Sequence, residues 1–185
     1  MIKEIIKQTE EKMHKAVEVV RHEFVKIRTG KATTALLDGV KVEYYGSQAP
    51  LQQVANVSVK DIHTISIQPW DKNMIQPIEK AVIAANLGLN PITDANGIRV
   101  PIPPLNEERR KELVKLVKKF AEEGKIAVRN VRRDAIEHLK KSEKLEHFSE
   151  DERKRAEQDV QKMTDEFIKD VDGLVELKEK EIMEV

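Results

Sequence analysis

The chain has 185 residues, enough for one or two domains with a hydrophobic core. Charged residues make up 36% of it and aromatic residues only 4%, a composition that suits long amphipathic helices better than a β-sandwich. The absence of cysteine excludes a disulfide framework, a thiolate nucleophile and a cysteine metal site. No apolar run reaches the roughly 18 residues of a membrane span, and the N-terminus lacks a signal peptide's apolar stretch, so we expect a soluble cytoplasmic protein.

The net charge of zero hides an asymmetry along the chain. Residues 106–144 hold 13 Lys/Arg and 8 Asp/Glu, a net charge of +5, whereas residues 145–185 hold 7 Lys/Arg and 14 Asp/Glu, a net charge of −7. Packed side by side, these two segments would give the molecule a basic flank and an acidic flank. A basic flank can dock on a polyanion while the neutral total limits indiscriminate binding.

Residues 2–28 are predicted to form a helix, because apolar residues recur there at helical spacing. Gly30 follows as a candidate C-terminal stop. The apolar positions are Ile2, Ile6, Met13, Val17, Val20, Phe24 and Ile27.

Residues 31–105 have a different character, since they contain four of the seven glycines and all seven prolines. The segment 40–45 alternates like a strand and ends at a Gly-Ser turn, and the segments 54–59 and 62–68 predict two more short strands. Asn96-Gly97 predicts a hairpin between two further apolar stretches. The segment therefore predicts a small β/α domain.

The same segment contains one predicted helix, over residues 71–87. Asp71 is its candidate N-cap. Pro77 is tolerated only in a first turn, so we expect the regular helix to begin near it.

Two long helices are predicted after the stiff, proline-rich linker 101–104. Asn106 caps the first of them, which runs to about residue 144, and Gly124 on its apolar stripe would allow a neighbouring helix to approach closely. The segment 149–152 is a capping box that begins the last helix. The predicted inward-facing residues are Leu113, Leu116, Val117, Phe120, Ala127, Val131 and Ala135, then Ala156, Val160, Met163, Phe167, Val171, Leu174 and Ile182.

None of the three long helices can bury its stripe alone, so we expect an elongated antiparallel three-helix bundle, about 55–60 Å long at 1.5 Å per residue. The predicted fold class is α+β. Residues 1–30 and 106–185 form the bundle domain, and residues 31–105 form the β/α domain inserted after the first helix.

The sequence contains no enzyme signature: no P-loop, no GxGxxG after a strand, no HExxH and no GxSxG. We therefore expect a protein that is not an enzyme, with no catalytic residue, metal ligand or cofactor. The five histidines are scattered, which favours surface positions over a metal or catalytic site, and paired carboxylates such as Asp170 and Asp172 are expected to face solvent. The histidines are His14, His22, His63, His138 and His147.

The strongest pattern is the run 128–134, which contains three arginines inside the second long helix. Arg129 and Arg132 are predicted to project from one face, with Arg133 beside them. Lys118 and Lys125 lie near the same stripe. Such a row fits a phosphate-binding face and also fits a merely solvated helix face; the spacing alone leaves both open.

Further arginines lie at helix ends: Arg28 ends the first helix, and Arg109 and Arg110 open the second. Aromatic residues are too scarce for single-strand binding by base stacking. Folded RNA, recognised through its backbone and shape, fits this chain better.

Seven sequence blocks together resemble the ribosome recycling factor family, in the family's order and over the whole chain. Each block alone is weak, whereas the ordered set is highly specific. The blocks are 28–32 (RTGKA), 50–51 (PL), 68–71 (QPWD), 86–91 (NLGLNP), 97–101 (GIRVP), 104–110 (PLNEERR) and 128–134 (VRNVRRD).

The resemblance implies a role after translation termination. A protein of this family binds the large ribosomal subunit through its rRNA and, with elongation factor G and GTP, splits the post-termination ribosome and releases mRNA and tRNA. GTP hydrolysis belongs to elongation factor G, so this chain needs no nucleotide site. The inserted domain is the part expected to meet the partner factor.

The resemblance also implies functional residues. Arg110, Arg129 and Arg132 match the family's RNA-binding arginines, and Arg132 is the strongest single candidate. Further candidates are Arg28, Arg109 and Arg133, for which the alternative is ion pairing on the helix surface, as between Arg133 and Glu137. The family's hinge matches Gly30, Lys31, Pro104 and Leu105. Two departures, Asn106 at the cap and Pro77 in the small helix, leave the arginines untouched.

A second hypothesis is an interaction scaffold whose helices pair with another protein's coiled coil without contacting RNA. It predicts self-association or an apolar stripe only partly used within the chain. The recycling hypothesis predicts a monomer with a closed bundle and no membrane contact.

Overall fold

A computed structural model describes residues 2–146 and 148–184, and it divides into two compact units. The helical unit comprises Met1–Arg28 and Glu107–Glu184, and the second unit comprises Thr29–Asn106. His147, expected at the surface, lies outside the described residues.

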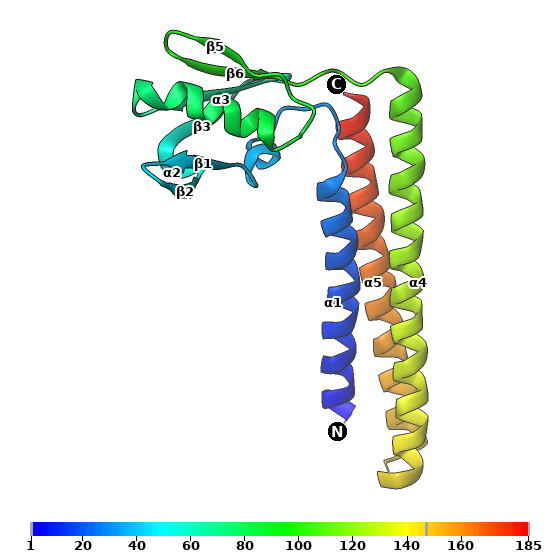
Figure 1. Cartoon of the computed structure of the whole chain (residues 1–185). Helices are drawn as coiled ribbons and strands as arrows, with labels where there is room; N and C mark the ends of the chain where they lie inside the picture. Colours follow the sequence, from blue (N-terminus) through cyan, green and yellow to red (C-terminus); the bar gives the residue numbers. More distant parts are fainter. Residues whose placement is uncertain (1, 147, 185) are drawn as a thin grey trace. The chain divides into compact units, whose positions relative to one another are not determined.

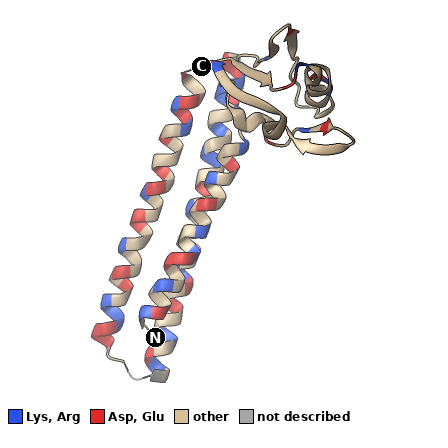
Figure 2. Ribbon diagram, turned by 90° about the vertical axis from the view of Figure 1, so that its left-hand side faces the viewer, with Lys and Arg blue, Asp and Glu red and all other residues tan. Residues whose placement is uncertain are grey.

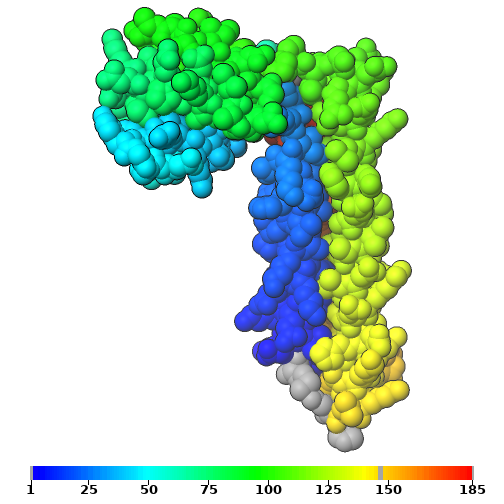
Figure 3. Space-filling model, in the orientation of Figure 1, coloured from blue at the N-terminus to red at the C-terminus, as the bar shows by residue number. Residues whose placement is uncertain are grey.

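The helical unit is a three-helix bundle made of α1 (Ile2–Lys26), α4 (Glu107–Glu146) and α5 (Glu150–Met183). Each helix contacts the other two, and α4 runs antiparallel to α1 and α5 (Figure 1). Figure 3 shows α1, in blue, lying along α4, in green and yellow. The bundle and the α+β fold class predicted from the sequence are confirmed.

The buried stripe of α4 differs in phase from the prediction. Leu113, Val117 and Ala135 are buried as expected, whereas Val131 is only half-buried. Val128, inside the arginine-rich run, is completely buried. The reason is that α4 contacts two helices at once, so its buried face is centred between them. Ala121, Gly124, Leu139 and Ser142 of α4 are also buried.

Two predicted helix ends can be compared directly with the structure. The capping box at the start of α5 is present: the Ser149 hydroxyl accepts from the Glu152 N–H, and the Glu152 carboxylate accepts from the Ser149 N–H at 2.9 Å. Gly30 is not the stop of α1, because α1 ends at Lys26 and the Ile27 N–H closes a tight turn on the Phe24 carbonyl.

The second unit contains two antiparallel sheets. β1 (Lys41–Tyr44) and β2 (Ser47–Pro50) form a two-stranded sheet. The four-stranded sheet has the order β3-β4-β6-β5, and its strands are β3 (Ala55–Asp61), β4 (Thr64–Pro69), β5 (Ile92–Asp94) and β6 (Gly97–Pro101). Of three helical turns, η1 (Thr34–Leu37) precedes β1, α2 (Leu51–Val54) joins β2 to β3, and η2 (Lys72–Met74) leads from β4 into α3 (Ile75–Ala84).

A single apolar core holds this unit together. Alternate residues of β4 and β6, including Ile65, Ile67 and Val100, point into it and are fully buried, and Ile78 of α3 packs against them. The predicted helix 71–87 is shorter in the structure: Asp71 caps η2 by accepting from the Asn73 N–H at 2.9 Å, and α3 begins at Ile75. Pro77 therefore lies in the first turn of α3, as expected.

The hairpin predicted at Asn96-Gly97 exists, but its turn lies one residue earlier, at Ala95–Asn96. The Asp94 carboxylate accepts from the N–H groups of Asn96 and Gly97 at 2.9 and 3.0 Å, which sets the turn. Gly97 is needed for close packing, because a Cβ there would lie 2.7 Å from the Ile67 carbonyl oxygen. The turn with two positive φ angles is instead Tyr45–Gly46, between β1 and β2.

At Gly124, α1 approaches α4 so closely that a Cβ there would lie far inside van der Waals contact with Val20. Alanine would gain about 1 kcal/mol in helix propensity, but overpacking costs about 1–3 kcal/mol. We expect Gly124→Ala to lower the free energy of unfolding by about 1 kcal/mol, measured by urea denaturation. Gly173→Ala in α5, where a Cβ would meet nothing within 4 Å, should instead be stabilising by about 0.5–1 kcal/mol.

The same substitution in a Val20→Ala background tests the cause. There, Gly124→Ala should become stabilising, because the clashing methyl group is gone. A loss of stability that persists in that background would show that the close approach to Val20 is not the constraint.

The capping box predicts a pH dependence. Hydrogen bonds from the Ser149 backbone N–H and hydroxyl hold the pKa of Glu152 below its ordinary value. Its contribution to stability is therefore fully present above the ordinary glutamate pKa of about 4.3 and is lost as pH falls through the lowered value. We expect Glu152→Gln to lower the melting temperature at neutral pH and to make the acid-induced loss of stability shallower, measured by circular dichroism.

Glu166→Gln, on the same helix, is the matched control. The Glu166 carboxylate has no side-chain hydrogen bond or ion pair within residues 2–146 and 148–184, so this change removes no such contact and should leave the melting temperature at neutral pH near that of the parent chain. Identical profiles for Glu152→Gln and the parent chain would contradict the expectation.

Candidate nucleic-acid interface

Four cations of α4, of which three belong to the predicted stripe, lie along the seam between α4 and α5. Arg110, Lys118, Lys125 and Arg132 recur at intervals of about two helical turns, which places them on one flank. Each reaches a group of α5: Arg110 Nη1 donates to the Met183 carbonyl at 3.3 Å, Lys118 pairs with Glu179 at 3.6 Å, Lys125 pairs with Asp172, and Arg132 Nη1 donates to Gln161 Oε1 at 3.0 Å.

These four contacts differ in whether they neutralise the charge of the α4 cation. Lys118 and Lys125 face carboxylates, so much of their charge is neutralised within the bundle. Arg110 and Arg132 are instead held by neutral acceptors, a backbone carbonyl and an amide oxygen. In both, the Nε atom is buried and has no hydrogen-bond partner within the described residues. The two guanidinium groups are thus positioned on the seam while their charge remains available to an anion.

Gln161 is a residue that the sequence analysis missed. Its amide Nε2 donates to Asp165 Oδ1 at 2.9 Å while its Oε1 accepts from Arg132, so it links α5 to the guanidinium. A neutral glutamine in an acidic helix carries no sequence signal, and only the packing of α4 on α5 reveals its role.

The remaining arginines of α4 are placed differently. Arg129 pairs with Glu122 of its own helix at 3.0 Å, and Arg109 pairs with Glu112 at 2.8 Å. Such exposed pairs contribute only about 0–1 kcal/mol and are easily exchanged for a phosphate. Arg133 is exposed and has no hydrogen bond or ion pair within the part of the chain that the structure describes.

The alternative in which Arg133 pairs with Glu137 is wrong. Glu137 pairs with Lys141 at 2.7 Å instead, and the hydrogen bond from Lys141 lowers the pKa of Glu137.

The candidate arginines fall into two groups along the bundle. Arg129, Arg132 and Arg133 lie within about one turn of α4. Arg109 and Arg110 lie at the start of that helix, about 33 Å from Arg132 at 1.5 Å per residue. Arg28 is exposed and follows α1, whose C-terminal end points toward the end of the bundle at which α4 begins (Figure 1). Figure 2 shows acidic residues interspersed among the cations on all three helices.

The predicted hinge residues lie where the chain enters and leaves the second unit. Gly30 has φ of +75°, and a Cβ there would lie 3.2 Å from Leu105 Cγ, so the two passing segments touch at this point. Lys31 and Pro104 beside them are exposed.

Backbone hydrogen bonds hold the flanking residues to the turn between β3 and β4. The Ala32 N–H donates to the Ile62 carbonyl and the Ile102 N–H to the His63 carbonyl, both at 2.7 Å. The His63 ring Nδ1 lies 3.2 Å from the Gly30 carbonyl oxygen, a structural role for this histidine that the sequence did not indicate.

Of the remaining histidines, His14, His22 and His138 are exposed. Among the described residues, no group of three or more His, Asp or Glu side chains is arranged to hold a metal ion. None of the helices in the described part of the chain is both long and apolar enough to cross a bilayer.

Comparison with known proteins identifies the family. The family model described as "Ribosome recycling factor" matches residues 20–183, a range that includes all six candidate arginines. This chain belongs to the ribosome recycling factor family. It is 56% identical over 185 residues to the ribosome-recycling factor of Symbiobacterium thermophilum, covering 100% of both chains, and 52% identical over 184 residues to that of Burkholderia mallei, covering 100% of this chain and 99% of the relative.

Solved structures of ribosome recycling factors share the fold. A solution structure of the ribosome recycling factor superposes with a TM-score of 0.77 at 49% identity, covering 100% of this chain and 98% of the other. A second structure, described as models for the T. thermophilus ribosome recycling factor and the E. coli elongation factor G bound to the E. coli post-termination complex, has a TM-score of 0.65 at 49% identity and covers 99% of each chain. The resemblance inferred from the sequence blocks is confirmed.

The hydrogen bond between Arg132 and Gln161 should contribute a measurable free energy to the stability of this recycling-factor bundle. We expect a double-mutant cycle of Arg132→Ala and Gln161→Ala to give a coupling free energy of about 0.5–1 kcal/mol in urea denaturation. The control cycle pairs Gln161→Ala with Arg133→Ala and should give a coupling near zero, because Arg133 has no partner in the described chain. Equal coupling in the two cycles would show that Gln161 does not hold Arg132.

Proposed function

We propose that this chain performs the function for which the ribosome recycling factor family is named. In this proposal it binds rRNA of the large ribosomal subunit and, with elongation factor G and GTP, splits the post-termination ribosome and releases mRNA and tRNA. Family membership supports the proposal, as does the related structure described as a recycling factor with elongation factor G on the post-termination complex.

The observation that carries the RNA-binding step is the pair of uncompensated guanidinium groups on the α4/α5 seam. Arg110 and Arg132 are fixed by neutral acceptors, so they need no reorganisation before binding and lose no carboxylate partner when they meet a phosphate. Their spacing along a rigid helix, about 33 Å, suits two separate contacts on folded RNA rather than one pocket.

The other candidate arginines extend this surface in the proposal. Arg129 and Arg133 flank Arg132 on α4, and Arg109 flanks Arg110. Arg28 would contribute from the end of α1, where the bundle meets the entering chain. Arg129 and Arg109 would exchange their exposed carboxylate partners for phosphate oxygens on binding.

We propose that the inserted unit meets elongation factor G and moves relative to the bundle about a hinge at Gly30, Lys31, Pro104 and Leu105. The backbone hydrogen bonds of Ala32 and Ile102 to the β3–β4 turn fix residues 32–102 within the inserted unit. The rotation would therefore be confined to the few residues outside them.

The proposal assigns no covalent chemistry to this chain. GTP hydrolysis belongs to elongation factor G. In this proposal the recycling factor works in the cytoplasm, where its bundle stays bound to the ribosome while the inserted unit moves. It works as a monomer in this proposal, since the apolar stripes of α1, α4 and α5 pack on one another and support the closed bundle over the scaffold hypothesis.

Splitting of post-termination ribosomes, followed by light scattering with elongation factor G and GTP, tests the function. We expect scattering to fall only when all three components are present, and Arg132→Ala to slow the fall. Removal of one phosphate contact should also weaken binding to the large subunit and flatten its dependence on log salt by about one unit.

Lys125→Ala is the matched control, because it removes a cation on the same flank that is already neutralised by Asp172. It should change the salt slope less than Arg132→Ala does. If Arg132→Ala leaves both the affinity for the large subunit and its salt dependence unchanged, Arg132 does not anchor the protein. If the parent chain does not bind the large subunit, the proposed function is wrong.

A further inference from the structure

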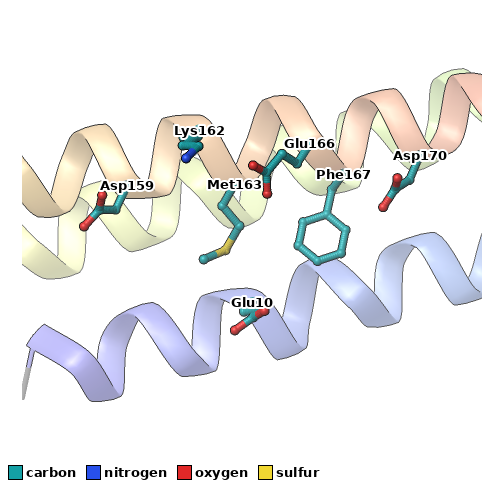
Figure 4. Close-up of a pocket in the computed structure, with 7 residues that line it drawn as sticks. All are labelled: Glu10, Asp159, Lys162, Met163, Glu166, Phe167 and Asp170. Atoms are coloured by element: carbon teal, nitrogen blue, oxygen red, sulfur yellow. The ribbon is translucent and has the colours of Figure 1, made fainter.

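A groove lies between α1 and α5, on the flank of α5 away from its contacts with α4. It has a volume of about 240 Å³ (Figure 4). Met163 and Phe167, one helical turn apart on α5, project from that helix toward α1 and form an apolar floor. Both side chains are only half-buried, so part of this apolar surface remains exposed.

Carboxylates surround this floor. Asp159, Glu166 and Asp170 come from α5 and Glu10 comes from α1, while Lys162 is the only cation among the described residues that line the groove. We call these four carboxylates with Met163 and Phe167 the α1/α5 groove. The carboxylates lie on several successive turns, so they spread along the groove rather than converge on one point.

The fold leaves the charge of these carboxylates uncompensated. Within residues 2–146 and 148–184, none of the four makes a side-chain hydrogen bond or an ion pair. On the α4-facing flank of the same helix, by contrast, Asp172 and Glu179 are paired with lysines. The acidic residues that face α4 therefore stabilise the bundle, whereas the four that line this groove have no partner among the described residues.

An apolar floor inside an acidic rim favours one class of ligand. Anionic RNA is repelled by the rim, and no group of side chains in the described chain is arranged to hold a metal ion. The volume is below the usual 300–1,000 Å³ of small-molecule sites, and it suits a single apolar side chain. Charge complementarity requires cations on either side of that side chain.

We propose that the α1/α5 groove docks a lysine- and arginine-rich segment of another protein, which inserts one apolar side chain between Met163 and Phe167. The flexible Met163 side chain can adapt its shape to the inserted group. The cations of the segment meet the rim carboxylates. Leu177, two turns beyond Asp170 on the same flank and 62% exposed, offers a further apolar contact. The groove and the α4/α5 seam lie on different flanks of α5, so this proposal does not depend on the RNA-binding role.

The test is binding of a fluorescent peptide of lysine and arginine with one central leucine to the full chain, measured by anisotropy. We expect saturable binding that weakens at least tenfold in the double variant Glu166→Gln/Asp170→Asn. The matched control, Asp172→Asn/Glu179→Gln, removes the same formal charge from the paired flank and should weaken binding less than threefold. Circular dichroism of each variant verifies that the bundle is folded.

A second peptide separates docking from diffuse attraction. Replacing its central leucine by serine keeps every charge and should weaken binding at least fivefold, because the apolar floor then loses its partner. Equal affinity for the two peptides would show that the groove attracts any cation and would overturn the proposal. Displacement of the leucine peptide by spermine as readily as by the same peptide without its fluorophore would have the same meaning. Equal weakening by the two double variants would also overturn it.

A second copy of the chain is the other occupant to be tested. Sedimentation of the parent chain should show a monomer at concentrations where the peptide binds. Self-association that disappears in Glu166→Gln/Asp170→Asn would show that the groove is an interface between copies, and the proposal would fail.

Discussion

The burial of α4 against both α1 and α5 is the interaction on which the rest of the helical unit depends. Each long helix carries one apolar stripe and is otherwise highly charged, so no helix is stable until the three stripes close on one another. Gly124 lets α1 come close enough to complete this contact. Once the core is closed, every remaining side chain of α5 lies near α4, near α1, or in solvent. That position decides whether a charged side chain has a partner of opposite charge.

The two edges of α5 show how one core produces two different surfaces. Along the seam with α4, carboxylates neutralise lysines, and Gln161 and the Met183 carbonyl hold arginines without neutralising them. Along the edge with α1, four carboxylates around an apolar floor have no side-chain hydrogen bond or ion pair with another described residue. A chain with zero net charge thus carries, on one surface of α5, two arginines held by neutral acceptors and, on another, four carboxylates without a partner among the described residues. In the recycling function, the first surface would anchor the protein on RNA, while the second would not compete for phosphate.

Particular residues show where prediction from sequence succeeded and where it failed. The capping box at Ser149, the close approach at Gly124 and the position of Pro77 were all predicted, because each depends on residues adjacent along the chain or on one helix face. The turn at Ala95–Asn96 was misplaced by one residue, since the Asp94 side chain and the closeness of Gly97 to β4 decide the register. The Arg133–Glu137 pair was wrong because Lys141 competes for the same carboxylate at the same i,i+4 spacing.

The family and the α+β fold class could be predicted from the sequence alone, because helical periodicity and local motifs are properties of the chain. Which cations keep their charge depends on how the helices pack against one another. Arg132 and Lys125 are seven residues apart on one flank, yet one meets an amide and the other a carboxylate of α5. That difference depends on the register between two helices, which is set by how their apolar side chains interlock in the core.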